Sequence, residues 1–160
     1  MGNFLDALFK KLSSYQLFNF IVPGALFLGI LKFLFDVDIQ IDNNIWWFML
    51  ASYITGISLS RFGSIVIEGF LLKGGIIKDY DVRKYLQKKK DYELIEMLLE
   101  LTNLYRTLCA LFTVLFLITF KFKDPCECHW FLTELSLAIL FGLSFYKQYN
   151  YFLDSINNGD

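Results

Sequence analysis

The sequence contains few of the residues from which enzymes build active sites. Among its 160 residues there is one histidine, His129, and there are three cysteines. No H-E-x-x-H, P-loop or G-x-G-x-x-G motif occurs. A single histidine cannot support most acid–base chemistry. We therefore expect no enzymatic activity and no cofactor.

One short cluster, Cys126-Glu127-Cys128-His129, resembles a metal site. It offers at most three adjacent soft ligands, and the sequence has no second cluster of Cys or His residues to complete the site. Structural zinc sites use four spaced ligands. We favour a disulfide over a metal, either between the two cysteines or across subunits in an oxidising compartment. Cys109 lies within an apolar run and is expected to be inert.

The abundant residues are apolar. Hydrophobic residues make up 56% of the chain and aromatic residues 19%, and the mean hydropathy is +0.46. Four spans of about 20 residues each would occupy half of the chain and leave little for a soluble domain. The net charge of −1 gives no overall attraction to nucleic acid or anionic lipid. We predict an all-α, polytopic membrane protein with one membrane domain over residues 1–160.

Hydropathy predicts four transmembrane helices, over residues 15–35, 45–72, 107–122 and 130–147. Residues 1–14 carry apolar side chains at helical spacing, which predicts an amphipathic helix on the membrane surface. The first apolar run is longer than a signal-peptide core and no A-x-A-like cleavage site comes after it. We therefore expect it to be a transmembrane span.

Basic residues gather between the second and third spans, which predicts that residues 74–106 are cytoplasmic. They are Lys78, Arg83, Lys84, Lys88, Lys89, Lys90 and Arg106. Asp81 and Asp91 are candidate caps for two helices, one over residues 82–89 and one continuing into the third span. A basic helix beside an acidic one predicts a helical hairpin. Both termini are then cytoplasmic.

The second span carries a stripe of small residues at every fourth position. Such ladders let helix backbones approach closely in lipid. We expect a homo-oligomer in which replacing Gly56 or Ser60 by Leu disrupts packing. The stripe consists of Ser52, Gly56, Ser60 and Ser64, and Glu68 occupies its next position.

Arg61 and Glu68 are the two charged residues of this span before its final lysine. At 3.6 residues per turn a spacing of seven places them on nearly the same face, near the inner edge of the hydrocarbon. Two interpretations stay open. The side chains either snorkel into water, or line and gate a polar passage in an assembly.

The basic run over residues 83–90 also has two interpretations. It either reflects the positive-inside rule or holds anionic lipid headgroups, or it binds a nucleotide or single-stranded oligonucleotide beside Tyr80, Tyr85 and Tyr92. Glu134, about one turn inside the fourth span, is expected to snorkel outward. An external acidic ring that favours cations is the alternative.

Three strings carry a resemblance to a family: SLSRFGSIVIEGFLLK (residues 58–73), TNLYRTLCALF (102–112) and SFYKQYNYF (144–152). They resemble small bacterial membrane proteins encoded beside anti-phage defence genes, of which the Hailong-type channel effector is the nearest named group. In such systems a nucleotidyltransferase is paired with an inner-membrane channel whose opening depolarises the infected cell. The resemblance implies functional roles for Arg61, Glu68, Asn103 and Arg106. The family pattern has proline after the glutamate, where this chain has Gly69.

The leading hypothesis is therefore an oligomeric pore controlled by a cytosolic ligand. The alternative is a non-conducting structural or accessory subunit of a membrane complex. Polar side chains repeated around a symmetry axis would favour the pore, and an entirely apolar interior would favour the accessory role.

The predicted topology can be tested by thiol labelling. In a Lys88→Cys variant the new thiol should react with a membrane-impermeant reagent only after the cells are opened, because position 88 lies in the predicted cytoplasmic segment. Labelling from outside intact cells would overturn the assignment of every loop.

Overall fold

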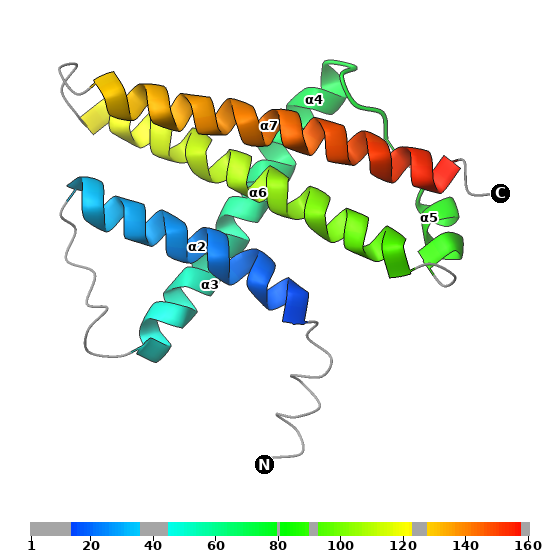
Figure 1. Cartoon of the computed structure of the whole chain (residues 1–160), viewed down its shortest axis with the longest axis horizontal. Coiled ribbons are helices and arrows are strands. Elements are labelled where there is room, and N and C mark those ends of the chain that lie inside the picture. Colours follow the sequence, from blue (N-terminus) through cyan, green and yellow to red (C-terminus); the bar gives the residue numbers. More distant parts are fainter. Residues whose placement is uncertain (1–13, 36–44, 80, 90–92, 123–127, 158–160) are drawn as a thin grey trace, which may run out of the picture. The chain divides into compact units, whose positions relative to one another are not determined.

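The computed structural model describes residues 14–35, 45–79, 81–89, 93–122 and 128–157, and these residues form helices and turns without any strand (Figure 1). The predicted all-α fold is confirmed. The expected amphipathic helix over residues 1–14 and the loop over residues 36–44 lie outside the described residues. In chain order the helices are α2 (Ser14–Phe35), α3 (Ile45–Phe62), the π-helix η1 (Gly63–Glu68), α4 (Gly69–Lys73), α5 (Val82–Lys89), α6 (Glu93–Phe122) and α7 (Cys128–Asn157).

Four helical segments are long and apolar enough to cross a membrane, at Phe18–Phe35, Ile45–Lys73, Leu94–Phe122 and His129–Asn157. The chain is a membrane protein with four transmembrane helices, and these segments overlap the four predicted spans. The helices α6 and α7 have 30 residues each, which corresponds to about 45 Å of helix against a hydrocarbon core of roughly 30 Å. As predicted, α6 runs without a break from the polar segment into the third span.

Large apolar side chains stand on the outside of these helices. Phe18, Ile54, Ile65, Phe120 and Leu143 are all more than half exposed. On a soluble monomer such a surface would be far larger than the usual apolar patch. On membrane helices it is the surface that lipid or neighbouring helices cover.

Hydroxyl groups on the helices bond to the backbone of their own helix. Each donates to the carbonyl oxygen four residues earlier, at 2.6–3.0 Å. This bond satisfies a polar group without any partner from outside the helix. The residues are Ser52, Ser58, Thr102, Thr107, Thr113, Thr133, Ser136, Ser144 and Ser155.

The chain divides into two compact units, Met1–Leu59 and Ser60–Asp160. In the first unit α2 and α3 cross at two glycines. A Cβ atom at Gly24 would overlap the Ser52 carbonyl, and one at Gly56 would overlap the backbone of Phe20. The small-residue stripe therefore does permit close backbone contact, and its first half meets α2 of the same chain. The Phe20 and Tyr53 rings pack edge to face beside this crossing, with centroids 6.0 Å apart.

The second unit is built on an antiparallel pair, α6 and α7, which lie side by side in Figure 1. Their rings stack between the helices: the centroids of Phe112 and Phe141 are 5.5 Å apart and the ring planes differ by 3°. Leu111 and Leu115 of α6 and Phe145 of α7 have no exposed surface. Interleaved side chains of this kind hold the two helices in one register.

The short helix α5 packs on the end of this pair. Its Tyr85 ring lies 5.9 Å from the ring of Phe152, over a cluster that contains Ile95 and Ile156. At its start the Asp81 carboxylate accepts a hydrogen bond of 2.9 Å from the backbone N–H of Arg83, so Asp81 is the predicted N-cap. The predicted hairpin of α5 and α6 is confirmed.

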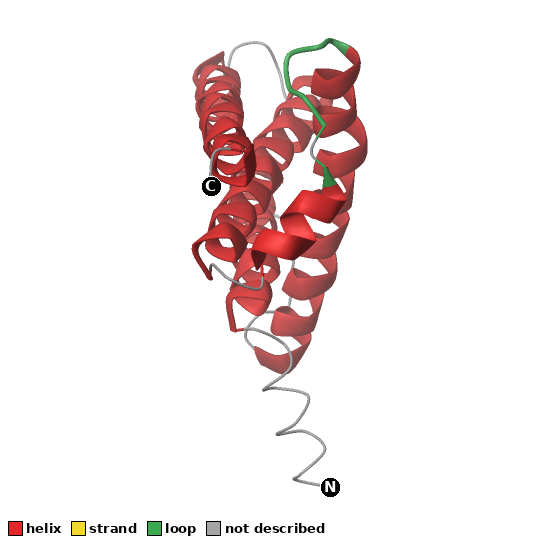
Figure 2. Ribbon diagram, turned by 90° about the vertical axis from the view of Figure 1, so that its right-hand side faces the viewer, coloured by secondary structure: helices red, strands yellow, loops and turns green. Residues whose placement is uncertain are grey.

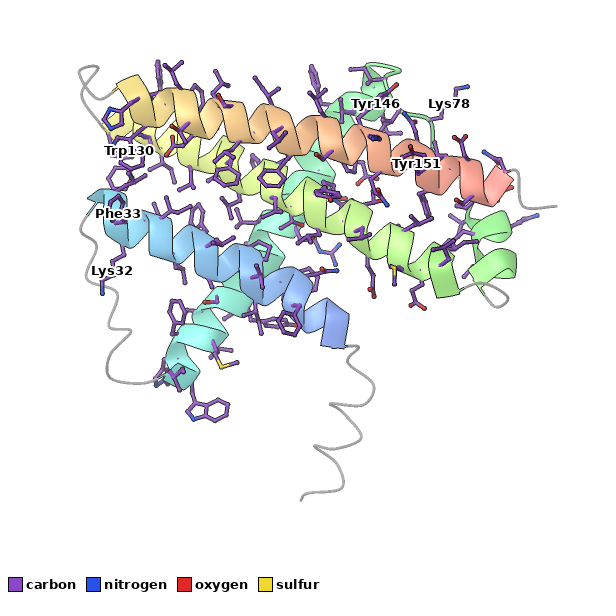
Figure 3. All side chains as sticks on the ribbon, viewed as in Figure 1. Lys32, Phe33, Lys78, Trp130, Tyr146 and Tyr151 are labelled. Carbon is purple, nitrogen blue, oxygen red and sulfur yellow. The ribbon has the colours of Figure 1, made fainter. Side chains whose placement is uncertain are left out.

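The loop between α4 and α5 is drawn in green in Figure 2, and its Ile77 packs against α7. Gly75 adopts φ = 67° and ends the helix, as its position after the second span predicts. Ile77 is buried between Phe145 and Tyr149, and the Tyr149 hydroxyl donates a 2.9 Å hydrogen bond to the Lys78 carbonyl. Figure 3 shows Lys78 beside the stretch of α7 that carries Tyr146 and Tyr151. We call residues 74–79 the docked loop.

The crossing of α2 and α3 gives a matched pair of glycine substitutions. Gly24→Ala should lower the free energy of unfolding in mixed micelles by about 1–3 kcal/mol, because its Cβ meets backbone that cannot move aside. In the same helix an added Cβ at Gly29 meets nothing within 4 Å. Gly29→Ala should therefore be neutral or stabilise by about 0.5–1 kcal/mol. Equal effects of the two substitutions would contradict the close crossing.

Candidate functional site

The second, third and fourth transmembrane helices each have a stretch without Asp, Glu, Lys or Arg, at residues 45–60, 107–120 and 135–146. These stretches are bounded by Arg61, by Arg106 and Lys121, and by Glu134 and Lys147. Charged groups at the edge of an apolar stretch are costly unless water or a partner is near. The structure gives a partner to Arg106.

Arg106 of α6 forms an ion pair with Glu68, the last residue of η1. Its Nη1 donates to the Glu68 Oε2, and the Ser64 hydroxyl donates to the same oxygen at 3.3 Å. The side chains of Arg106 and Glu68 are only 13% and 18% exposed. Charge-assisted bonds of this kind are stronger than neutral ones and gain further strength where water is excluded.

Gly63 brings the two helices close together at this pair. A Cβ atom there would lie 3.2 Å from the Arg106 Cγ and carbonyl oxygen, and 3.3 Å from the Ala110 Cβ. The start of η1 therefore rests directly on α6. This contact places the base of the Arg106 side chain against η1, from which its guanidinium reaches Glu68.

The π-helical segment separates Arg61 from Glu68. A π-helical turn contains one more residue than an α-helical turn, so it rotates the residues after it by about 100° relative to a continuous α-helix. The expectation that both residues share a face assumed an uninterrupted α-helix and therefore differs from the structure. Arg61 is exposed, whereas Glu68 is half-buried and bonded to α6.

Of the six residues expected at a pore or gate, hydrogen bonds join Ser64, Glu68 and Arg106. Ser60 is half-buried, one turn before Ser64. Asn103 is half-buried on α6, and its carbonyl accepts a 2.8 Å bond from Thr107. Glu68 thus has its partner on another helix. Removal of Glu68 would leave the mostly buried charge of Arg106 without this partner.

The guanidinium of Arg106 is not fully saturated. Its Nε is buried and meets no hydrogen-bond acceptor within the described part of the chain. The site therefore brings together a guanidinium, a carboxylate and the Ser64 hydroxyl. If the pair opened, a cation and a carboxylate would stand on facing helices at the edge of the apolar stretch.

A second buried carboxylate lies at the other end of α6 and α7. Glu134 is 4% exposed and accepts a 2.9 Å hydrogen bond from the Thr119 hydroxyl. The expected outward snorkelling of Glu134 is therefore wrong, because the carboxylate turns between the helices towards Thr119. The hydroxyls of Thr119 and Ser64 bond to carboxylates, unlike the hydroxyls that bond to the backbone of their own helix.

The basic residues proposed to bind a ligand occupy α5 and its end. Arg83 is exposed, and Lys84, Lys88 and Lys89 belong to the same helix. Lys90, Tyr80 and Tyr92 lie outside the described residues. Tyr85 packs against Phe152, so its ring already has a partner and does not stand free for stacking on a base.

The cysteines offer no further site among the described residues. Cys109 is buried, as expected, and its Sγ lies 3.4 Å from the Ala138 carbonyl oxygen. Cys128 begins α7, whereas Cys126 lies outside the described residues. Within the described ranges no three His, Cys, Asp or Glu residues group to hold a metal ion.

Comparison of the chain with protein-family models, with curated proteins and with solved structures gives no match.

Sequence reasoning missed Gly63 and Thr119 as contributors to the two polar sites. Gly63 could have been found from its position between Arg61 and Glu68, where a small residue permits close approach to a charged partner. Thr119 carries no such signal. A threonine in an apolar run usually bonds to its own helix, and only the pairing of α6 with α7 brings Glu134 within reach.

The ion pair should contribute to stability as well as to function. Glu68→Gln and Arg106→Gln should each lower the free energy of unfolding by about 3 kcal/mol, because each leaves one charge in a mostly buried place. The control is Arg61→Gln, which alters an exposed charge on the same helical run and should change stability by no more than about 0.5 kcal/mol. Unfolding in mixed micelles measures all three. A loss for Arg61→Gln equal to that of the pair would contradict the assignment.

Proposed function

We propose that this protein is the pore-forming subunit of an oligomeric membrane channel, and that the Glu68–Arg106 ion pair is part of its gate. The observation that supports the proposal is the pair itself. It joins a π-helical segment to α6 at the edge of an apolar stretch, and Ser64 donates to the same carboxylate. Ionisable residues at membrane depth and single π-helical turns both concentrate at functional sites.

The wider role rests on the resemblance of residues 58–73, 102–112 and 144–152 to defence-associated channel proteins. In this proposal the channel sits in a bacterial inner membrane with both termini in the cytoplasm. A nucleotide or oligonucleotide made by a nucleotidyltransferase binds the basic helix α5, and its binding or loss opens the pore. The resulting depolarisation halts the infected cell. The protein itself catalyses no reaction.

A non-conducting accessory subunit is the second candidate. One observation favours it: Glu68 and Arg106 pair within one chain, so the pair could act solely as a clamp between η1 and α6. A clamp and a gate make different predictions, because only a gate changes ion flux when the fold is intact.

Ion flux through proteoliposomes tests the proposed channel directly. Purified wild-type protein should dissipate a potassium gradient, read with a potential-sensitive dye. Glu68→Gln should change the rate by about fivefold or more, as expected for a gating equilibrium shifted by the loss of one coupled pair. Gly29→Ala, at an open position of α2, is the matched control and should conduct like wild type.

Absence of flux from wild-type protein, with and without added oligonucleotide, would favour the accessory subunit. Wild-type flux from a folded Glu68→Gln protein would remove the pair from the gate and leave the channel in place.

A further inference from the structure

The π-helix η1 carries one residue more than an α-helix would need over the same length. Its six residues, Gly63–Glu68, lie between two α-helical segments of one continuous run. π-Helical turns are rare because their hydrogen-bond geometry is less favourable than that of the α-helix. Such a turn therefore persists where contacts on both sides keep the extra residue in place.

Both sides of η1 have such contacts. At its start Gly63 rests on the Arg106 carbonyl oxygen and on Ala110. After its end, α4 is joined to the docked loop, because the backbone N–H groups of Ile76 and Ile77 donate to the Leu71 carbonyl at 3.0 and 3.4 Å. The rotation of α4 about its axis is therefore coupled to the position of the docked loop.

The docked loop meets α7 through the side chain of Ile77 and through a hydrogen bond to its backbone. Ile77 is 3% exposed and lies between Phe145 and Tyr149, with Leu71 and Leu72 of α4 packed against the same cluster. The Tyr149 hydroxyl bonds to the Lys78 carbonyl. The proposed ligand-binding helix, α5, begins shortly after this attachment, at Val82.

We propose that docking of residues 74–79 on α7 holds η1 in its π-helical register, and that release of this loop returns η1 to the α-helical register. The return removes one residue from the turn, so it rotates Glu68 by about 100° and moves Ile67 into its place opposite Arg106. The ion pair then separates. A ligand that pulls α5 and the docked loop from α7 would in this way open the pair.

The consequence for conduction rests on the proposed channel function, whereas the register change does not. The docked loop and η1 would form one two-state element, in which the cytosolic attachment and the membrane ion pair are broken or made together. Tyr149 and Ile77 are positioning residues in this scheme, since they act on the ion pair only through the docked loop and η1.

The register can be read by cross-linking in membranes. In a background with Cys109, Cys126 and Cys128 replaced by alanine, two cysteine pairs are compared with a short bifunctional thiol reagent. Glu68→Cys with Arg106→Cys reports the π-helical register, and Ile67→Cys with Arg106→Cys reports the α-helical one. Phe112→Cys with Phe141→Cys, on α6 and α7, is the control pair and should link in every variant.

With the docked loop intact, the pair at 68 and 106 should link more than the pair at 67 and 106. Tyr149→Phe, which keeps the ring and removes the hydrogen bond, should shift the ratio towards the pair at 67 by about two- to tenfold. Adding Ile77→Ala should shift it further. If the control pair no longer links in the double variant, Tyr149→Phe alone decides the outcome.

Deletion of Ile65, an exposed residue of η1, provides the opposite test. It removes the extra residue, so residue 68 stays opposite residue 106 in an α-helical segment. Linking should then be insensitive to Tyr149→Phe.

A cross-linking ratio that Tyr149→Phe leaves unchanged in the chain without the deletion would overturn the proposal. If the cross-linking ratio shifts but the wild-type protein conducts no ions, the proposed channel function is wrong and the proposed register change of η1 stands.

Discussion

Polar groups in the apolar part of a membrane must find their partners inside the protein, and this constraint accounts for most of the side-chain hydrogen bonds on these helices. Nine serine and threonine hydroxyls meet it within their own helices. Gly24 and Gly56 let α2 and α3 meet through backbone atoms. In the described part of the chain the carboxylates of Glu68 and Glu134 are bonded across helices, to Arg106 and Thr119.

The two inter-helix carboxylates differ in what holds them. Glu134 lies in the α6–α7 pair, where stacked rings and buried leucines hold the helices in one register. Glu68 lies on a π-helical turn whose geometry depends on contacts at both of its ends. A buried ion pair is weak evidence for a stabilising role by itself. Its position on the less regular element is what favours a role in switching.

The sequence predicted the elements well because its signals are local. Apolar runs located the four spans, Asp81 and Gly75 marked a helix start and a helix end, and α6 continued as expected because no breaker interrupts it. The faces were less predictable. The α-helical rotation of 100° per residue placed Arg61 and Glu68 on one face, but it does not hold through η1. Nothing in the sequence GSIVIE distinguishes a π-helix from an α-helix. Glu134 was misplaced because its burial depends on Thr119 of another helix.

The lengths of α6 and α7 have a mechanical consequence. Each contains about ten residues more than the hydrocarbon core requires, and no break separates its membrane part from its polar part. A rigid rod transmits a tilt along its whole length without loss to an intervening hinge. A force applied where α5 contacts Phe152 would therefore act as a torque along the apolar part of the same two helices.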